Sequence, residues 1–183
     1  MGRINQQSHK LKDGRTVTIR TAHENDAEAY LTLGKSVMSE EIYTLTQADE
    51  LTFTIEQERN WIKTHIADDA HLIIVAEIDD RVVGQLDFMN GHRKRNSHTG
   101  EFGMGVHKDF RELGIGSFLL KALIGWAKNH SEIKKINLSV HKTNERAIAA
   151  YKKQGFQIEG TRTKDLKYPN EVYVDTVLMG LHV

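Results

Sequence analysis

The stretch EFGMGVHKDFRELGIGSFLLKALIGW, residues 101–126, decides the fold of this chain. Residues 101–106 read as a strand, and residues 111–116 form a glycine-containing loop. The second half then carries apolar side chains at the spacing of one helix face. These apolar positions are Ile115, Phe118, Leu119, Ala122, Leu123 and Trp126. The stretch therefore predicts a strand, a loop and an amphipathic helix in direct succession.

The loop at this junction has the chemistry of a phosphate site. Gly114 and Gly116 stand where the helix begins, and glycine lets a ligand approach the backbone closely. The first turn of a helix has N–H groups without partners at the positive end of its dipole, which attract anions. Arg111 adds a positive charge. Taken alone, so short a motif favours an ordinary turn over a phosphate site, because short motifs match by chance.

Other phosphate motifs do not fit. The P-loop pattern Gly-x-x-x-x-Gly-Lys-Ser/Thr is absent, and Gly103-Met104-Gly105 places Lys108 where the dinucleotide fingerprint needs its third glycine.

Working outward, strands alternate with helices along the chain. Strands are predicted at residues 16–20, 72–78, 82–89, 101–106, 136–140, 156–166 and 172–181. Helices are predicted from Asn25, from Thr54, from Ile115 and from Asn144. Residues 1–13 are polar and are expected to be loose, and residues 14–183 are expected to form one domain. The pattern predicts a mixed α/β sheet with helices on both faces.

Composition excludes several classes of protein. The chain has 183 residues, of which 39% are hydrophobic and 27% charged, as in globular proteins. Lys+Arg and Asp+Glu are equal at 25 each, which argues against a nucleic-acid binder. The absence of Cys excludes disulfides and thiolate catalysis. No signal peptide or membrane-spanning stretch is recognisable, so a cytoplasmic enzyme is expected.

A second block gives the loop its meaning. Asn144-Glu145-Arg146-Ala147-Ile148-Ala149-Ala150-Tyr151-Lys152-Lys153-Gln154-Gly155-Phe156 resembles the Asn-x-x-Ala-x-x-x-Tyr-x-x-x-Gly-Phe block of the GNAT acetyltransferase superfamily. That family's phosphate loop reads Gln/Arg-x-x-Gly-x-Gly/Ala, which Arg111-Glu112-Leu113-Gly114-Ile115-Gly116 matches. The two blocks occur in the family's order. The resemblance extends over nearly the whole chain, about residues 16–182.

The resemblance implies a fold, a cosubstrate and a set of roles. It implies a mostly antiparallel twisted sheet of about seven strands, with acetyl-CoA as acetyl donor, no metal, and a homodimer. The strand residues Met104, Gly105 and Val106 would contact the pantetheine arm through their backbone. The loop residues Arg111, Glu112, Leu113, Gly114, Ile115 and Gly116 would hold the pyrophosphate. Asn144 would hydrogen-bond the cofactor arm, and Tyr151 would protonate the departing thiolate.

The base that activates the acceptor is less defined. A lysine-like amine has a pKa near ~10.4, so only about one in ~2,500 is neutral at pH 7 and a base is needed. Ser139 stands where some relatives carry Glu, and a serine does not serve as that base unaided. Glu101 is the substitute candidate, acting through water, and a solvated strand-end carboxylate explains it equally well.

The predicted function is direct acetyl transfer to a primary amine in a ternary complex, because without Cys no cysteine-linked acetyl-enzyme forms. A small-molecule amine, an antibiotic or a peptide N-terminus would serve as acceptor. Acidic residues at 39–50, among them Glu40, Glu41, Asp49 and Glu50, either attract that amine or form an ordinary charged surface. An acyl-CoA-binding module with little catalysis is the alternative function, and a purely structural protein is a third.

Overall fold

One open sheet of eight strands organises the molecule. The computed structural model describes residues 2–40 and 43–183. The strand order is β1-β2-β3-β4-β5-β6-β8-β7. Neighbouring strands are antiparallel except β5 and β6, which run parallel. The predicted mixed and mostly antiparallel sheet is confirmed.

The strands are β1 (Gln7–Lys10), β2 (Thr16–Thr21), β3 (Leu72–Ile78), β4 (Arg81–Asn90), β5 (Thr99–Val106), β6 (Lys135–His141), β7 (Gln157–Tyr168) and β8 (Val172–His182). The helices are α1 (Ala27–Met38), α2 (Ile55–Ala67), α3 (Ile115–Asn129) and α4 (Glu145–Lys153), with 3-10 turns η1 (Glu24–Asp26), η2 (Lys108–Phe110) and η3 (Pro169–Glu171).

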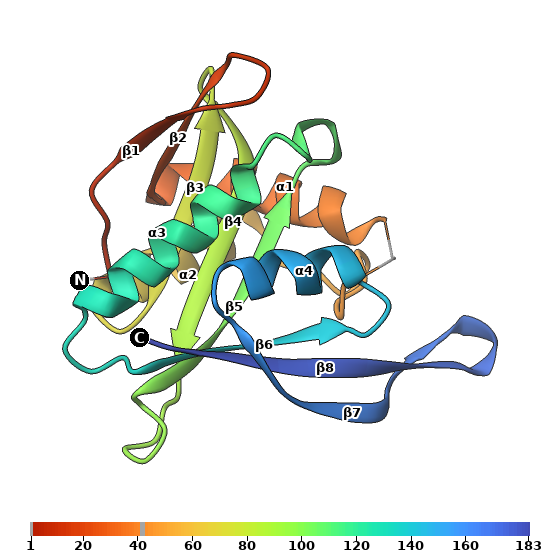
Figure 1. The fold of residues 1–183 in the computed structure, drawn as a ribbon. Helices are drawn as coiled ribbons and strands as arrows, with labels where there is room; N and C mark the ends of the chain where they lie inside the picture. The colour runs from red at the N-terminus through yellow and green to blue at the C-terminus, as the bar shows by residue number, and fades with distance from the viewer. Residues whose placement is uncertain (1, 41–42) are drawn as a thin grey trace.

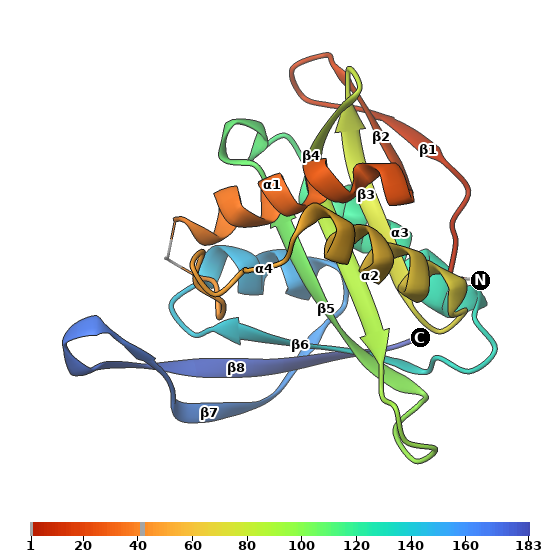
Figure 2. The ribbon, with the colours of Figure 1, turned by 180° about the vertical axis from the view of Figure 1, so that it is seen from behind.

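Helices cover both faces of the sheet, as predicted. Helices α3 and α4 lie on the face seen in Figure 1, and α1 and α2 lie on the face seen in Figure 2. The larger core cluster lies under α3 and includes Phe88, Leu119 and Leu123. A smaller cluster under α1 and α2 includes Tyr30, Ile62 and Ile73. Strands β6, β8 and β7 extend beyond α1 and α2 (Figure 2).

Local sequence sets the ends of these elements. Thr54 Oγ1 accepts a hydrogen bond from the Gln57 backbone N–H, and Gln57 Oε1 accepts one from the Thr54 N–H, which completes the predicted capping box of α2. Gly155, with φ of 96°, follows α4 and lets the chain leave it in the left-handed conformation. Asp79 and Asp80 also adopt positive φ, as a two-residue hairpin turn requires.

The N-terminal segment differs from the expectation of a loose tail. Residues 7–10 form β1, which pairs with β2 from Gln7 opposite Ile19 to Lys10 opposite Thr16. Further back, the Gly2 backbone N–H donates to Asp68 O at 3.0 Å and the Ile4 N–H donates to Thr21 Oγ1 at 3.0 Å. Backbone hydrogen bonds therefore order this segment although its side chains are polar, and they account for the eighth strand.

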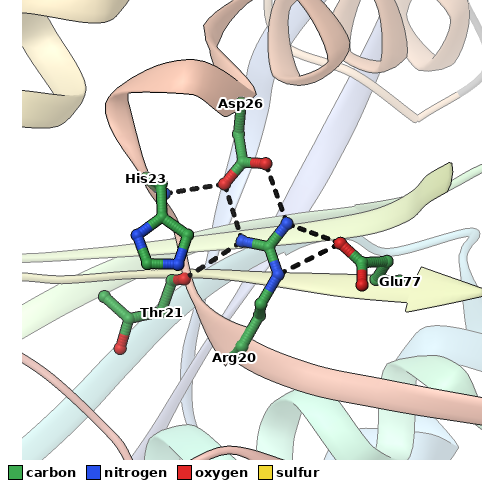
Figure 3. Close-up of polar contacts among 5 residues, drawn as sticks. All are labelled: Arg20, Thr21, His23, Asp26 and Glu77. Atoms are coloured by element: carbon green, nitrogen blue, oxygen red, sulfur yellow. Dashed lines mark hydrogen bonds and ion pairs between the residues drawn. The ribbon is translucent and has the colours of Figure 1, made fainter. Parts of the chain in front are cut away.

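A charged cluster fastens β2 to its neighbours. Figure 3 shows the Arg20 guanidinium between Asp26 of η1 and Glu77 of β3, with N–O distances of 2.7 and 2.6 Å. Burial is the largest single effect on Asp26 and raises its pKa, but the hydrogen bonds from Arg20 and the His23 N–H and the charge of Arg20 together lower it. The cluster ties the first helical turn to strands β2 and β3 of the sheet.

The pairing of β5 with β6 ends early, and this sets up the site. Only Thr99, Gly100 and Glu101 pair with β6, the last opposite Asn137. Strand β5 nevertheless continues to Val106, paired on its other side with β4 throughout. Beyond Glu101 the two parallel strands therefore separate, and Figure 1 shows them diverging beside α4. We call the edge of residues 102–106 that faces this opening the open edge of β5.

Candidate active site

The open edge offers backbone groups to a ligand. The His107 N–H donates to Val83 O on β4, so by strand alternation the N–H and C=O groups of Val106 and Met104 point to the other edge. The Val106 carbonyl is occupied, because Arg111 Nε donates to it at 3.0 Å. Met104, two residues earlier, directs its N–H and C=O into the opening. Backbone groups at an open strand edge are those with which an added extended chain pairs.

The two faces of β5 carry different chemistry. Phe102 and Met104 pack on the α3 and α4 side, where Phe102 meets the Tyr151 ring at 5.9 Å between centroids. Gly103 and Gly105 face the other side, since a Cβ on Gly105 would lie 3.2 Å from Val37 of α1. Glu101 shares the face of Gly103 and Gly105 by the same alternation. Its side chain is exposed.

The predicted phosphate loop has the backbone of an anion site. Glu112 and Gly114 adopt positive φ of 67° and 98°, a pattern that turns successive N–H groups inward. Gly114 is the N-cap of α3, so the first free N–H groups of that helix follow it directly. A Cβ on Gly116 would come 3.6 Å from Met104 Cε, which places the loop against β5. The loop and the open edge of β5 therefore form one continuous surface.

Arg111 carries an unexpected partner. Its two terminal nitrogens bond Glu40 at 2.7 and 2.6 Å, in the bidentate geometry of a strong ion pair. The hydrogen bond from Arg111 lowers the pKa of Glu40. The sequence left Glu40 either as an attraction for an acceptor amine or as part of an ordinary charged surface, and the structure pairs it with Arg111, 71 residues away in the sequence. Glu41, the next acid of that segment, lies outside the described residues.

Helix α4 brings the second predicted block to the loop. Gln154 Nε2 donates to Ser117 Oγ at 3.0 Å, and Arg146 Nη1 lies 2.9 Å from Glu112 Oε1. Asn144 is the N-cap of α4, with its Oδ1 accepting from the Ala147 N–H at 3.1 Å. That bond uses the amide oxygen, so the side-chain NH₂ is the group that a cofactor arm would meet.

Tyr151 lies among aromatic rings on the side of β5 that faces α3 and α4. Its ring contacts Phe102 and Phe156, each at 5.9 Å between centroids. Burial raises the pKa of Tyr151 to about 12. The hydroxyl therefore keeps its proton at neutral pH, as a proton donor must.

Sequence reasoning missed Asp87 on β4. Asp87 pairs with Gly103 and faces the same side of the sheet as Glu101. Tyr30 Oη of α1 donates to Asp87 Oδ1 at 3.2 Å. Burial raises the pKa of Asp87 to about 6, although the Tyr30 hydrogen bond opposes the rise. The signal was present: polar Gln85 and Asp87 alternate with apolar residues on a strand that two helices cover.

The segment between α1 and α2 covers part of this face. The Tyr43 ring meets His141 at the end of β6, with 5.7 Å between centroids. A Cβ on Gly34 of α1 would lie 3.5 Å from both Leu51 Cδ2 and Gln85 Nε2. This segment therefore contacts β6 at Tyr43 and α1 at Leu51, on the face of the sheet that carries Glu101.

Over residues 2–40 and 43–183, no group of three or more His, Asp or Glu side chains is arranged to hold a metal ion. Among the helices of these ranges, none combines the length and the apolarity that crossing a bilayer requires.

Comparisons with known proteins agree with this geometry. The model of the family described as "Acetyltransferase (GNAT) family" matches residues 39–156. The L-amino acid N-acetyltransferase AaaT of Escherichia coli (strain K12) is 39% identical over 107 residues, which cover 58% of this chain and 65% of that protein. The match thus spans less than two thirds of that relative.

Solved structures share the fold. The acetyltransferase of GNAT family from Streptococcus pneumoniae superposes with a TM-score of 0.88 and 26% identity, covering 91% of this chain and 99% of that one. The yncA structure from Salmonella typhimurium, solved with its cofactor acetyl-CoA, superposes with a TM-score of 0.80 at 18% identity, covering 91% and 93%.

Proposed function

Because the chain belongs to the acetyltransferase (GNAT) family and is an N-acetyltransferase, we propose that it moves the acetyl group of acetyl-CoA directly to a primary amine in a ternary complex. The observation that carries this is the open edge of β5. The edge ends at the phosphate loop. Tyr151 of α4 packs on Phe102 on one face of β5, and Glu101 lies on the other face.

The residues present fit acetyl-CoA. N–H groups of residues 113–116 bind the pyrophosphate at the start of α3, and the Met104 backbone pairs with the pantetheine arm. The Asn144 NH₂ contacts the same arm from α4. Acetyl-CoA supplies a thioester whose carbonyl carbon is open to attack by an amine. The adjacent Met104 N–H polarises that carbonyl, as a donor aimed at a developing oxyanion does.

Tyr151 and Glu101 divide the proton transfers. Glu101 lies on the acceptor face and takes the amine proton through water, while Tyr151 lies on the donor face and protonates the thiolate. Adjacent residues of a strand point to opposite faces. Glu101 therefore lies on one face of β5, and Phe102 packs on Tyr151 on the other. In this proposal the base and the acid stand on opposite sides of the acetyl carbonyl. A missing cysteine nucleophile supports direct transfer.

The acceptor is proposed to be a small primary amine, amino acids included. The E. coli relative is named for L-amino acids, and the acceptor face here carries the carboxylates Asp87 and Glu101. A panel of L-amino acids, their amides, polyamines, aminoglycosides and short peptides, followed by thiol release, tests this. Acetyl-CoA at a hundred times its Kd should raise the free energy of unfolding by about 2.7 kcal/mol. If it did not, the assignment of acetyl-CoA as the acetyl donor would be wrong.

Two variants test the proton transfers. Tyr151→Phe is expected to lower kcat at least ~10-fold, with the Kd of acetyl-CoA unchanged within about twofold. Tyr173→Phe, which removes a hydroxyl bonded to exposed Glu171 on the β7–β8 hairpin, is the control and leaves both constants unchanged. Glu101→Gln is expected to lower kcat with little effect on acetyl-CoA binding. An unchanged kcat in either active-site variant removes that residue from the reaction.

The cytoplasmic location and the homodimer stay predictions. Light scattering on the purified chain tests the second.

A further inference from the structure

Asp87 stands apart from the donor site and is used by none of the steps above. Its carboxylate is half-buried under α1, and the backbone of exposed Gly103 lies directly beside it. A Cβ on Gly103 would lie 3.2 Å from Asp87 Oδ1. Because glycine occupies this position, a small group arriving over β5 reaches the carboxylate.

Two buried amide oxygens on the same face of the sheet as Asp87 lack donors. The buried amide oxygens of Gln85 and Asn137 have no hydrogen-bond partner among the residues that the structure describes. Gln85 lies two residues before Asp87 on the same face of β4. Asn137 lies opposite Glu101 at the last β5–β6 pair. Buried polar oxygens without a donor are rare and call for an explanation.

Resting on the proposed function, we propose that Asp87 binds the ammonium group of the acceptor and orients it toward the open edge of β5. An ammonium has a positive charge and N–H donors, which match the Asp87 carboxylate. Glu101 and Asp87 are diagonal neighbours on adjacent strands, roughly 7–8 Å apart between Cα atoms in such a pair. An amine held by Asp87 is therefore within reach of the Glu101 base.

Charged neighbours set when Asp87 is ionised. Burial raises its pKa to about 6, while the Tyr30 hydroxyl of α1 and the His65 charge of α2 lower it. Glu58 of α2 is a nearby acid, whose own pKa is raised by burial and by the charge of Asp87. From β5 Glu101 faces the same space, and from β3 the paired residue is apolar Ile73. Asp87 is thus an anion at neutral pH and loses its charge below about pH 6.

Steady-state kinetics with the best amine of the panel test the proposal. Asp87→Asn keeps an oxygen for the Tyr30 hydroxyl but removes the charge. It is expected to raise the amine KM at least ~10-fold, in line with the loss of a charged hydrogen bond, with the acetyl-CoA KM unchanged within about twofold. Gly103→Ala, which keeps the charge but covers it, is expected to raise the amine KM as well. Asp69→Asn, on an exposed loop, is the matched control.

The pH profile adds a readout that a purely structural role leaves unmoved. Below about pH 7 the acceptor stays an ammonium, since even an α-amino group has a pKa of ~7.7–8.0, so a rise in amine KM below about pH 6 reports Asp87. Asp87→Asn is expected to abolish that rise. Tyr30→Phe removes a hydrogen bond that lowers the Asp87 pKa, so it is expected to shift the rise to higher pH. An amine KM that is unchanged in Asp87→Asn overturns the proposal.

A binding measurement separates this proposal from the proposed function. Alaninamide and lactamide differ only in carrying an ammonium or a hydroxyl, and calorimetry on the CoA-loaded protein compares them. Stronger binding of alaninamide that Asp87→Asn abolishes supports the ammonium site even if no amine is acetylated, which would sink only the proposed function. Equal binding of both amides to the wild-type protein overturns the ammonium site.

Discussion

The ionised carboxylate of Asp87 should lower the free energy of unfolding, and Asp87→Asn should show by how much. Its pKa is about 6 in the folded chain against 3.8 for the ordinary group. Because the folded pKa is the higher one, the folded chain favours the protonated carboxyl. This contribution to the free energy of unfolding is fully present below about pH 4 and is lost as pH rises through 6. At about 1.4 kcal/mol per pKa unit, a shift of roughly two units corresponds to a loss of ~3 kcal/mol above pH 7.

Asp87→Asn should therefore raise stability while it lowers the use of the amine. Since Asp87 is only half-buried, solvent screens part of the effect, and a gain of about 1–3 kcal/mol at pH 8 is expected. The gain should grow by up to ~1.4 kcal/mol between pH 5 and pH 8, as linkage with these two pKa values requires. Urea unfolding of both proteins at the two pH values measures it.

Asp26→Asn is the matched control with the opposite sign. The pKa of Asp26 is lowered in the folded chain by the Arg20 hydrogen bond, against the effect of burial. Its charge therefore stabilises above the unfolded pKa, and this stabilisation is lost as pH falls. Asp26→Asn should cost stability to about the same extent at pH 8 and at pH 5, because both values lie above the unfolded pKa of 3.8. The reasoning about Asp87 is refuted if Asp87→Asn gives the same stability difference at both pH values, or is less stable at pH 8.

Three further variants address other parts of the molecule. Arg20→Met should lower the free energy of unfolding by about 2–4 kcal/mol because it leaves two half-buried carboxylates without their partner. Arg15→Met breaks an exposed ion pair and should cost under ~1 kcal/mol. Equal costs in urea unfolding would contradict this. Gly114→Ala should cost ~1 kcal/mol at its φ of 98° and weaken acetyl-CoA binding in calorimetry; unchanged affinity would argue against the loop. Glu40→Gln should tighten acetyl-CoA a fewfold by freeing Arg111, and weaker binding would show that the pair organises the loop.

The parts of the fold that follow from the sequence are those with strong periodicity. Helix α3 shows its buried face in the spacing from Ile115 to Trp126, and hydrophobic packing is what fixes a helix of this kind. Strand β1 gave no such signal, because Gln7, Ser8, His9 and Lys10 include no aliphatic residue. Its position comes from backbone hydrogen bonds to β2, which every sequence can form.

The site divides in the same way. The loop at 111–116 and the block from Asn144 to Tyr151 were recognisable because each is continuous in the chain. The Arg111–Glu40 pair joins residues 71 positions apart, and no local pattern encodes such a pairing. Asp87 was read only as part of a strand, since its significance depends on Gly103 of the neighbouring strand.

These observations give β5 a role that its composition explains. A strand alternates between two faces, and here the even residues Phe102 and Met104 pack toward α3 and α4 while the odd residues Glu101, Gly103 and Gly105 face α1. Side chains as large as phenylalanine on the odd positions would fill the space over Asp87, and glycines on the even positions would leave the core under α3 unpacked. The alternation of large side chains with glycine therefore keeps the face toward α3 and α4 packed and leaves room on the face toward α1. In the proposed reaction, the two substrates would meet at the open edge between these faces.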